Sequence, residues 1–262
     1  MSVTPAGLFR RIGKEVTRAR LRLKAPGART LTDLANIYGS DKGDLWFAGH
    51  RYTEVYEQLF AGLRRRPLTL LEIGLRHHPF YRFRSTTSPS LRMWLDYFPQ
   101  ALVCGFDINE FSSMGSSRVR IFRGDQGNPA DLMKMLASVG ALDIVIDDGS
   151  HASYHQLVTL HALLPAVKPG GLYIIEDLCW QPEELEQSLP KTDTMVNLLR
   201  SQPFLHSVGL DSSNVRFFLN DALAVITMQD RERFYGVLQD FLQQNRLSWT
   251  FSRKTRSKRG RR

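Results

Sequence analysis

The sequence predicts an α/β fold, in which a mostly parallel β-sheet lies between helices and ends in an antiparallel hairpin. Short apolar runs rich in β-branched residues alternate with longer helical segments, as in βαβ units whose strands are buried on both faces. The last two runs flank the turn Asn220-Asp221, and so short a connection forces antiparallel pairing. The chain has 262 residues, of which 42% are hydrophobic, so it can bury one sizeable core.

The first 66 residues are predicted to form a helical extension. Leu8, Ile12, Val16 and Leu23 approximate one face of a helix that is otherwise rich in arginine. Such a face suits a membrane surface, the body of the protein or a partner. Two further helices are expected over residues 30–38 and 53–64, on either side of the glycine-punctuated segment 38–43.

Strands and helices then alternate up to the C-terminal tail. Ser88-Pro89 and Asn128-Pro129 each place a capping side chain and a proline at the start of a helix. The expected strands cover residues 68–75, 102–108, 119–124, 144–148, 172–177, 215–219 and 222–228. The expected helices start at residue 88 and cover residues 128–139, 153–167, 183–200 and 231–244. We expect Pro169-Gly170-Gly171 to end the helix of residues 153–167.

The chain is thereby divided into an N-terminal helical extension (1–66), an α/β domain (67–246) and a basic tail that we expect to be disordered (247–262). The net charge of +9 belongs to the ends. Residues 1–29 carry +7, from eight Lys or Arg against Glu15, and residues 252–262 carry +7, from seven Lys or Arg and no acid, so the central body is left with −5. Basic ends on an acidic body predict attraction to an anionic surface such as a membrane, or a solvated tail.

Composition also limits the cellular compartments in which we expect the protein. No apolar stretch reaches the roughly 18 residues of a membrane span, and the N-terminus lacks the apolar core of a secretory signal. Cys104 and Cys179 are the only cysteines, so we expect neither a disulfide framework nor a cysteine-based metal site. These features favour a cytoplasmic protein, with peripheral attachment at the inner membrane face as an alternative.

Two acidic pairs carry most of the chemical information. Asp147-Asp148 follows one apolar run and precedes His151, and Glu176-Asp177 follows the next apolar run. The carboxyl ends of parallel strands meet at one edge of a sheet, where open α/β folds bind ligands. Carboxylates gathered there need a cation or a hydrogen-bonding ligand to offset their charge. A hard divalent ion such as Mg²⁺ suits three oxygen ligands with open positions, and we expect it to act with His151 on a hydroxyl group.

Other strand ends carry weaker signals. Gly74 follows Leu71-Glu72-Ile73 at the end of the first strand, where a backbone without a Cβ can approach a ligand closely. Asp107 ends the second strand, and an acid there suits a ribose diol, as in dinucleotide-binding folds. Asp125 and Gln126 follow the third strand, where they could bind an adenine edge. Each signal alone is also explained by a turn or a helix cap, but their order along the chain strengthens the prediction.

These motifs give the chain a resemblance to a known family. Between residues 31 and 177 it resembles the metal-dependent sugar O-methyltransferases of the mycinamicin and macrocin type, which are class I S-adenosylmethionine-dependent methyltransferases. The motifs that carry the resemblance are residues 38–42 (YGSDK), 90–94 (SLRMW), 125–126 (DQ), 146–151 (IDDGSH) and 174–178 (IIEDL). The last two are the most specific.

The resemblance implies a seven-stranded Rossmann-like sheet and a role for each site residue. It implies His151 as the general base and three Mg²⁺ ligands, Asp148, Glu176 and Asp177. It implies that S-adenosylmethionine is held by Asp107 and Asp125, and we expect the whole set of cofactor-binding residues to be Glu72, Gly74, Asp107, Asp125, Gln126 and Asp147. One departure concerns the loop after Gly74, because the family has a glycine-rich stretch there and this chain has residues 75–82 (LRHHPFYR).

The expected function is methylation of a sugar hydroxyl in a glycosylated natural product or glycolipid. Such a hydroxyl is a poor nucleophile at neutral pH, but a cation lowers its pKa and a neighbouring histidine can remove the proton. We expect a small-molecule or lipid-linked glycoside as substrate and a homo-oligomer. Two alternatives stay open: a nucleic-acid methyltransferase, which the basic ends favour but the acidic body opposes, and a non-catalytic relative resembling cephalosporin hydroxylases, which the missing glycine-rich stretch favours.

Overall fold

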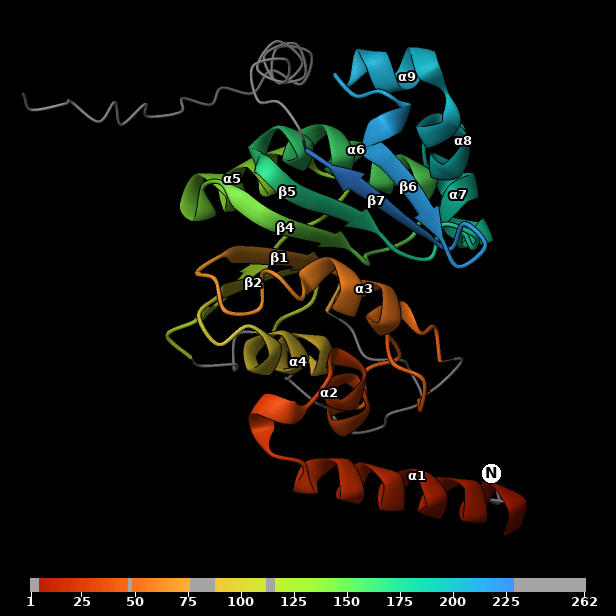
Figure 1. The fold of residues 1–262 in the computed structure, drawn as a ribbon. Coiled ribbons are helices and arrows are strands. Elements are labelled where there is room, and N and C mark those ends of the chain that lie inside the picture. The colour runs from red at the N-terminus through yellow and green to blue at the C-terminus, as the bar shows by residue number, and fades with distance from the viewer. Residues whose placement is uncertain (1–4, 47–48, 76–87, 112–115, 229–262) are drawn as a thin grey trace, which may run out of the picture.

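The computed structural model describes residues 5–46, 49–75, 88–111 and 116–228, with side chains from residue 12 onward (Figure 1). Its centre is a seven-stranded sheet with the strand order β3-β2-β1-β4-β5-β7-β6. The strands are β1 (Thr69–Ile73), β2 (Leu102–Asp107), β3 (Val119–Arg123), β4 (Leu142–Asp147), β5 (Val167–Ile175), β6 (Val215–Phe218) and β7 (Leu223–Thr227). The predicted sheet is therefore confirmed.

The strand pairing creates one ligand-binding edge. Strands β1 to β5 pair in parallel, and β7 runs antiparallel to both β5 and β6, as the short turn between the last two strands predicts. From β1 the chain moves outward to β2 and β3 and then returns to β4 on the other side of β1. Connections from β1 and β4 therefore leave in opposite directions, which opens a crevice above their carboxyl ends.

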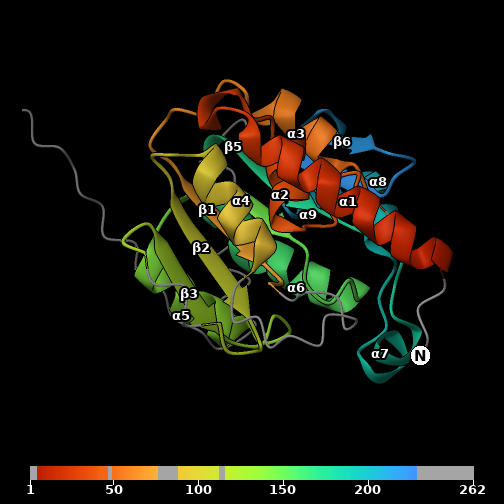
Figure 2. The ribbon, with the colours of Figure 1, turned by 90° about the horizontal axis from the view of Figure 1, so that it is seen from below.

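Helices cover both faces of the sheet (Figures 1 and 2). On one face lie α2 (Leu31–Tyr38), α3 (Tyr52–Phe60) and α4 (Pro89–Tyr97), and on the other lie α5 (Pro129–Val139), α6 (Ser153–Leu163) and α8 (Met195–Arg200). The remaining helices are α1 (Pro5–Leu23), α7 (Glu183–Ser188) and α9 (Gln202–Ser207), together with the 3₁₀ turns Pro26–Ala28, Leu164–Ala166 and Ser212–Asn214. No helix in the described ranges is long and apolar enough to cross a membrane.

Each face of the sheet has its own hydrophobic core. Tyr56 and Trp94 pack with Ile146 beneath α3 and α4, while Leu136 and Leu160 pack on the opposite face. Because residues of α2 and α3 share a core with the strands, these two helices of the N-terminal segment pack on the sheet. The domain boundaries at residues 66 and 246 stay predictions.

Predicted helix starts agree with the capping side chains. Ser88 accepts a hydrogen bond from the backbone N–H of Leu91, and Asn128 accepts one from that of Ala130, each before a proline at the start of the helix. Thr30 begins α2 with a reciprocal capping box to Asp33. These local bonds explain why the helix starts were easier to predict than the helix ends.

Several predicted boundaries are wrong. The helix expected over residues 153–167 ends at Leu163, and β5 already begins at Val167 and continues through Pro169-Gly170-Gly171. The proline is tolerated there because the register between β4 and β5 shifts between Leu142 and Ile144. The helix expected over residues 183–200 is two helices, α7 and α8, and α3 ends at Phe60 rather than residue 64. No helix was predicted at α9, and the helix of residues 231–244 and the tail of residues 247–262 lie outside the described residues.

Gly74 joins the ends of β1 and β4 at the ligand-binding edge. Its φ is +83°, and its N–H donates to the carbonyl of Phe106 over 2.9 Å. The N–H of Asp148 donates to the carbonyl of Ile73 over 3.0 Å, so the two loops lie against each other. A Cβ at Gly74 would lie 1.9 Å from the carbonyl oxygen of Asp148. The position therefore needs glycine for its conformation and for the close approach.

We expect Gly74→Ala to lower the free energy of unfolding several times more than Gly39→Ala. Both glycines have left-handed φ, +83° and +86°, so alanine costs about 1–2 kcal/mol at either position. Only at Gly74 does the new methyl group meet backbone, whereas nothing lies within 4 Å at Gly39. Urea unfolding of the two variants measures the difference. Equal losses would mean that the backbone around Asp148 moves aside without cost.

Candidate active site

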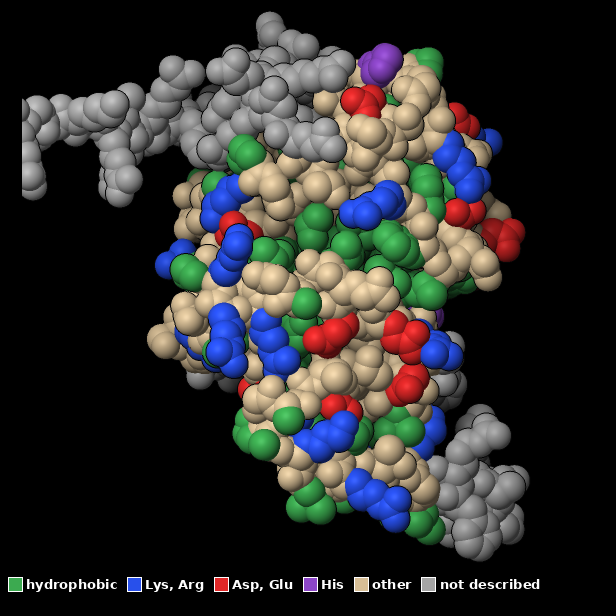
Figure 3. All heavy atoms as spheres, viewed as in Figure 1, with side chains coloured by type: hydrophobic (Ala, Val, Ile, Leu, Met, Phe, Trp, Pro, Cys, Tyr) green, Lys and Arg blue, Asp and Glu red, His purple; other side chains and the backbone are tan. Residues whose placement is uncertain are grey.

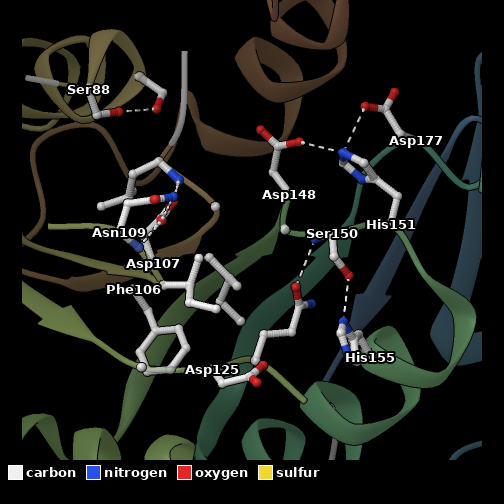
Figure 4. Close-up of a pocket in the computed structure, with 18 of the residues that line it drawn as sticks. Ser88, Phe106, Asp107, Asn109, Asp125, Asp148, Ser150, His151, His155 and Asp177 are labelled. Atoms are coloured by element: carbon white, nitrogen blue, oxygen red, sulfur yellow. Dashed lines mark hydrogen bonds and ion pairs between the residues drawn. The ribbon is translucent and has the colours of Figure 1, made fainter. Parts of the chain in front are cut away.

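A cavity of about 770 Å³ opens at the carboxyl edge of the parallel strands (Figure 4). Each parallel strand contributes a lining residue where it ends: Gly74, Asp107, Asp125, Asp148 and Asp177 for β1 to β5 in turn. The volume lies within the range of about 300–1,000 Å³ that is usual for small-molecule sites. Residues 76–87, which contain the unusual loop after Gly74 together with His77 and His78, lie outside the described residues.

One end of the cavity is built around the carboxylate of Asp107. Its Oδ2 accepts from the backbone N–H of Leu75 over 2.7 Å, and its Oδ1 accepts from the backbone N–H and the side-chain amide of Asn109 over 2.7 and 2.8 Å. These bonds fix the orientation of the carboxylate. An ionised carboxylate has about four accepting positions, and three are used here, so Oδ2 of Asp107 can still accept from one hydroxyl group.

Asp125 and Gln126 reach the same cavity from β3 but differ in what they can offer. Asp125 is exposed, and its Oδ1 accepts from the N–H of Gly127 over 2.8 Å. The amide of Gln126 is already used, because it donates to Asp147 over 3.0 Å and accepts from the N–H of Ser150 over 2.8 Å. Gln126 therefore ties the loop after β3 to the loop after β4.

Glu72 and Asp147 lie behind the cavity wall. Asp147 is 1% exposed and accepts from Gln126 and from Thr159, and burial raises its pKa to about 6. Glu72 is fully buried and accepts from the hydroxyl of Ser90 over 2.7 Å, and burial raises its pKa to about 7. Gln126 and Ser90 line the cavity, whereas Glu72 and Asp147 do not. A cofactor in the cavity would therefore touch Gln126 and Ser90, and it would interact with Asp147 and Glu72 only indirectly, through these two side chains.

The other end of the cavity brings together Asp148, His151 and Asp177 (Figure 4). His151 Nε2 lies 3.7 Å from Asp177 Oδ2 and 4.0 Å from Asp148 Oδ1. One ligand atom from each of the three residues lies within 4.8 Å of the others, close enough to share one metal ion. The three side chains are 16–21% exposed, so they remain accessible from the cavity.

Two of these residues have unusual backbone conformations. His151 has φ +61° and Asp177 has φ +53°, in the left-handed region that costs a non-glycine residue about 1–2 kcal/mol. Such strain persists only where the surrounding structure enforces it, and it is concentrated at functional sites. For Asp177 the turn also interrupts the strand alternation after Glu176, so the two acids of this pair meet different partners.

Glu176 does not join the group of Asp148, His151 and Asp177 in this structure. Its Oε2 accepts from the ammonium of Lys42 over 2.7 Å, and its Oε1 accepts from the hydroxyl of Tyr56 over 2.5 Å. Both oxygens are therefore engaged. Two of the three expected metal ligands converge with His151, and the third is turned toward Lys42.

Lys42 is a functional candidate that the sequence reasoning missed. Its side chain is 2% exposed, and Nζ donates to Asp148 as well as to Glu176 and lies 3.5 Å from Glu72 Oε1. Burial alone would lower the pKa of Lys42, but the attraction of Asp148, Glu176 and Glu72 outweighs it and raises the pKa well above its ordinary value. Burial and Asp148 raise the pKa of Glu176, and the Lys42 ammonium opposes that rise. Lys42 is therefore a fixed positive charge between three carboxylates.

Two tyrosines of α3 hold the second acidic pair. The Tyr52 hydroxyl donates to Asp177 Oδ1 over 2.6 Å, and Tyr56, one helical turn later, donates to Glu176. Their i, i+4 spacing, visible in the sequence, puts both hydroxyls on one helix face. Nothing in the sequence shows which strand end that face meets.

An apolar wall borders the cavity beyond His151. The Trp180 ring lies 5.5 Å from the His151 ring, edge to face, and the indole is 56% exposed. Leu185 of α7 and Leu189 just after it also line the cavity. This wall offers apolar contact area beside the polar group.

Comparison with known proteins places this site in context. No family model matches the chain. Over 148 residues it is 43% identical to the 8-demethyl-8-alpha-L-rhamnosyl tetracenomycin-C 2'-O-methyltransferase of Streptomyces olivaceus and 39% identical to the demethylmacrocin O-methyltransferase of Streptomyces fradiae. Each match covers 56% of this chain, but 37% and 36% of those relatives, so the chain spans little more than a third of their length.

Solved structures agree with these sequence matches. The MycE methyltransferase from the mycinamycin biosynthetic pathway, in complex with Mg and SAH, aligns with a TM-score of 0.64 at 30% identity, covering 78% of this chain and 56% of that chain. Its complex with Mg, SAH and mycinamycin VI aligns with a TM-score of 0.62 at 30% identity. The chain therefore has the Rossmann-like fold of class I methyltransferases. Its resemblance to sugar O-methyltransferases of the mycinamicin and macrocin type is confirmed.

We expect Lys42→Met to lower the free energy of unfolding by about 3–5 kcal/mol, because it leaves buried carboxylates without their cation. Lys24→Met is the matched control, since the Lys24 ammonium also lies 2.9 Å from a carboxylate, that of Asp33, but its side chain is 48% exposed. An ion pair this exposed contributes at most about 1 kcal/mol. Urea unfolding at neutral pH compares the two, and a loss at Lys42 no larger than at Lys24 would contradict the central role of this ammonium.

Proposed function

We propose that this protein is an S-adenosylmethionine- and Mg²⁺-dependent O-methyltransferase that methylates a sugar hydroxyl of a glycosylated natural product or glycolipid. The observation that carries the proposal is the division of one cavity into two ends (Figure 4). Asp107 lies at a strand end suited to a nucleoside, and Asp148, His151 and Asp177 form a group suited to a cation and proton transfer. The named relatives act on glycosylated antibiotics, which supports the same substrate class.

The group at the second end fits a hard divalent cation. Carboxylate oxygens are the protein ligands that Mg²⁺ prefers, and Asp148 and Asp177 present theirs to the cavity. Asp148 and Asp177 would hold the ion, which when bound lowers the pKa of a nearby hydroxyl group. Glu176 remains the third proposed ligand, although in this structure its carboxylate is bonded to Lys42 and Tyr56.

The first end fits S-adenosylmethionine, which supplies an activated methyl group. Asp107 would accept a hydrogen bond from a ribose hydroxyl, with its carboxylate already oriented by Leu75 and Asn109. Asp125 and Gln126 would flank the adenine, and the backbone of Gly74, which lines the cavity, would contact the methionine part. Phe106 and Ile108, which come before and after Asp107 in the chain, also line the cavity and offer apolar contacts that suit a nucleoside.

His151 is the proposed general base. Its Nε2 faces the cavity acids, so it can take a proton from an acceptor hydroxyl placed beside them. The carboxylates of Asp148 and Asp177 lie within 4.0 Å of this nitrogen, so an acceptor hydroxyl between them would also lie beside it. The positive φ of His151 fixes where the ring lies, and the Trp180 edge packs against it. The acceptor sugar would then lie against Trp180.

The proposal also covers the substrate, the oligomeric state and the cellular location of the protein. We place it in the cytoplasm as a homo-oligomer, which acts on a small-molecule or lipid-linked glycoside. Its basic ends would draw it to an anionic membrane surface at the inner face.

Calorimetry with S-adenosylmethionine, with and without Mg²⁺, tests the function. We expect the cofactor to bind in the presence of a chelator, and Asp107→Ala to weaken that binding by about 1–3 kcal/mol.

Methyl transfer to rhamnosylated tetracenomycin or macrolide acceptors should stop on chelation and resume with Mg²⁺ or Mn²⁺. Glu54→Ala, which changes an exposed carboxylate of α3 paired with Arg51, is the control. Absence of cofactor binding would favour a non-catalytic relative, and full activity after exhaustive chelation would exclude the metal.

We expect His151→Ala to lower turnover by about 10²–10⁴-fold while the affinities for cofactor and metal stay almost unchanged. The residual activity should rise with pH, because hydroxide partly replaces a missing base. Titration of Mg²⁺ by calorimetry separates the two roles that the geometry allows. If Mg²⁺ affinity falls with turnover, His151 is a metal ligand rather than the base. His206→Ala is the control, since this histidine of α9 is exposed and does not line the cavity, and its turnover should match that of the unmodified enzyme.

A further inference from the structure

Helix α1 lies along one end of the molecule, outside the layer formed by α2 to α4 (Figures 1 and 2). Its contacts with the body come from its basic side. Lys14 and Arg18 lie over the Trp46 ring, 5.5 and 5.7 Å from its centroid, and the Arg18 guanidinium donates to the carbonyl of Ile37 over 2.5 Å. These two residues are one helical turn apart and define the side that faces the protein.

The apolar side of the helix faces away from the protein. Ile12, Val16, Ala19 and Leu23 follow one another at spacings of four, three and four residues, which puts them in one stripe. All four are exposed, and the exposed fractions are 51% for Ile12, 47% for Val16 and 87% for Leu23. Hydrophobic side chains accordingly appear over α1 at the lower edge of the molecule (Figure 3). This orientation is the reverse of that of a helix whose apolar face packs on its own domain.

Basic residues flank the apolar stripe. Arg20 and Arg22 are exposed on either side of it, and within the described part of the chain neither guanidinium has an acidic partner. Glu15 is the single acid of the helix, and it already lies 3.7 Å from Arg18. Pairing with a second copy through this stripe would bring arginines against arginines, which opposes association. An anionic surface satisfies both the apolar stripe and its basic flanks.

We propose that α1 docks this protein on an anionic lipid bilayer, with the stripe Ile12–Val16–Ala19–Leu23 in the interface and Arg20 and Arg22 at the headgroups. Stable attachment through a short amphipathic helix needs a second signal. The sequence supplies one, since residues 252–262 carry seven further Lys or Arg and no acid. Docking and the proposed methyl transfer use different residues, since none of the α1 side chains described from Ile12 onward lines the cavity.

Sedimentation of the full-length protein with lipid vesicles tests the proposal. We expect binding to vesicles that contain phosphatidylglycerol, no binding to pure phosphatidylcholine, and weaker binding as the salt concentration rises. The variant Ile12→Gln/Val16→Gln/Leu23→Gln keeps the charge and changes exposed residues only. Each lost apolar contact should weaken binding about tenfold. Leu219→Gln, at an exposed apolar residue of the β6–β7 turn, is the matched control and should bind like the unmodified chain.

Three results would overturn the proposal. The first is no binding of the full-length protein to phosphatidylglycerol vesicles. The second is equal binding of the triple variant and the unmodified chain, which would assign attachment to the basic C-terminal segment alone. The third is a change of oligomeric state of the triple variant in analytical ultracentrifugation with unchanged vesicle binding, which would mean that a second copy covers the stripe.

Discussion

Three carboxylates that follow or belong to three different strands, Glu72, Asp148 and Glu176, surround the buried ammonium of Lys42. Without that charge, burying them together would cost several kcal/mol for each ion. The ammonium therefore permits acidic side chains to gather at a largely buried edge of the sheet, and it decides which acids remain available. Glu176 is held on Lys42, whereas Asp177 is free to meet His151. The Lys42 ammonium is therefore a permanent positive charge of the fold. It lies beside the group of Asp148, His151 and Asp177, which suits a metal cation.

The backbone conformations of Gly74, His151 and Asp177 also help to position the side chains of the site. Gly74 allows the loops after β1 and β4 to touch, which puts Asp148 over the crevice. His151 and Asp177 adopt left-handed conformations that a free peptide would rarely hold, so packing around them, including Tyr52 and Trp180, determines where their side chains point. Backbone strain thereby accompanies a fixed arrangement of the imidazole and the two carboxylates, before any ligand binds.

Strand positions, the antiparallel hairpin and the helix caps followed from the sequence, because each depends on local patterns. Ser88-Pro89 and Asn128-Pro129 satisfy backbone donors within a few residues, and the β6–β7 turn is too short for parallel pairing. Boundaries that depend on distant contacts were wrong. Proline in β5 is tolerated only because of an irregular pairing with β4, which no local pattern reveals.

The sequence by itself also determined that the acids of β4 and β5 share an edge with His151, because parallel strands deliver their carboxyl ends to one side. Only the tertiary structure decided how these acids are divided. Asp147 is enclosed by Thr159 and Gln126 behind the wall, and Glu176 is turned to Lys42 and Tyr56. Residues that contribute these partners are up to 134 positions away in the chain. Periodicity and spacing describe neighbours along the chain, whereas the charge balance of a buried site is set by groups that meet only after folding.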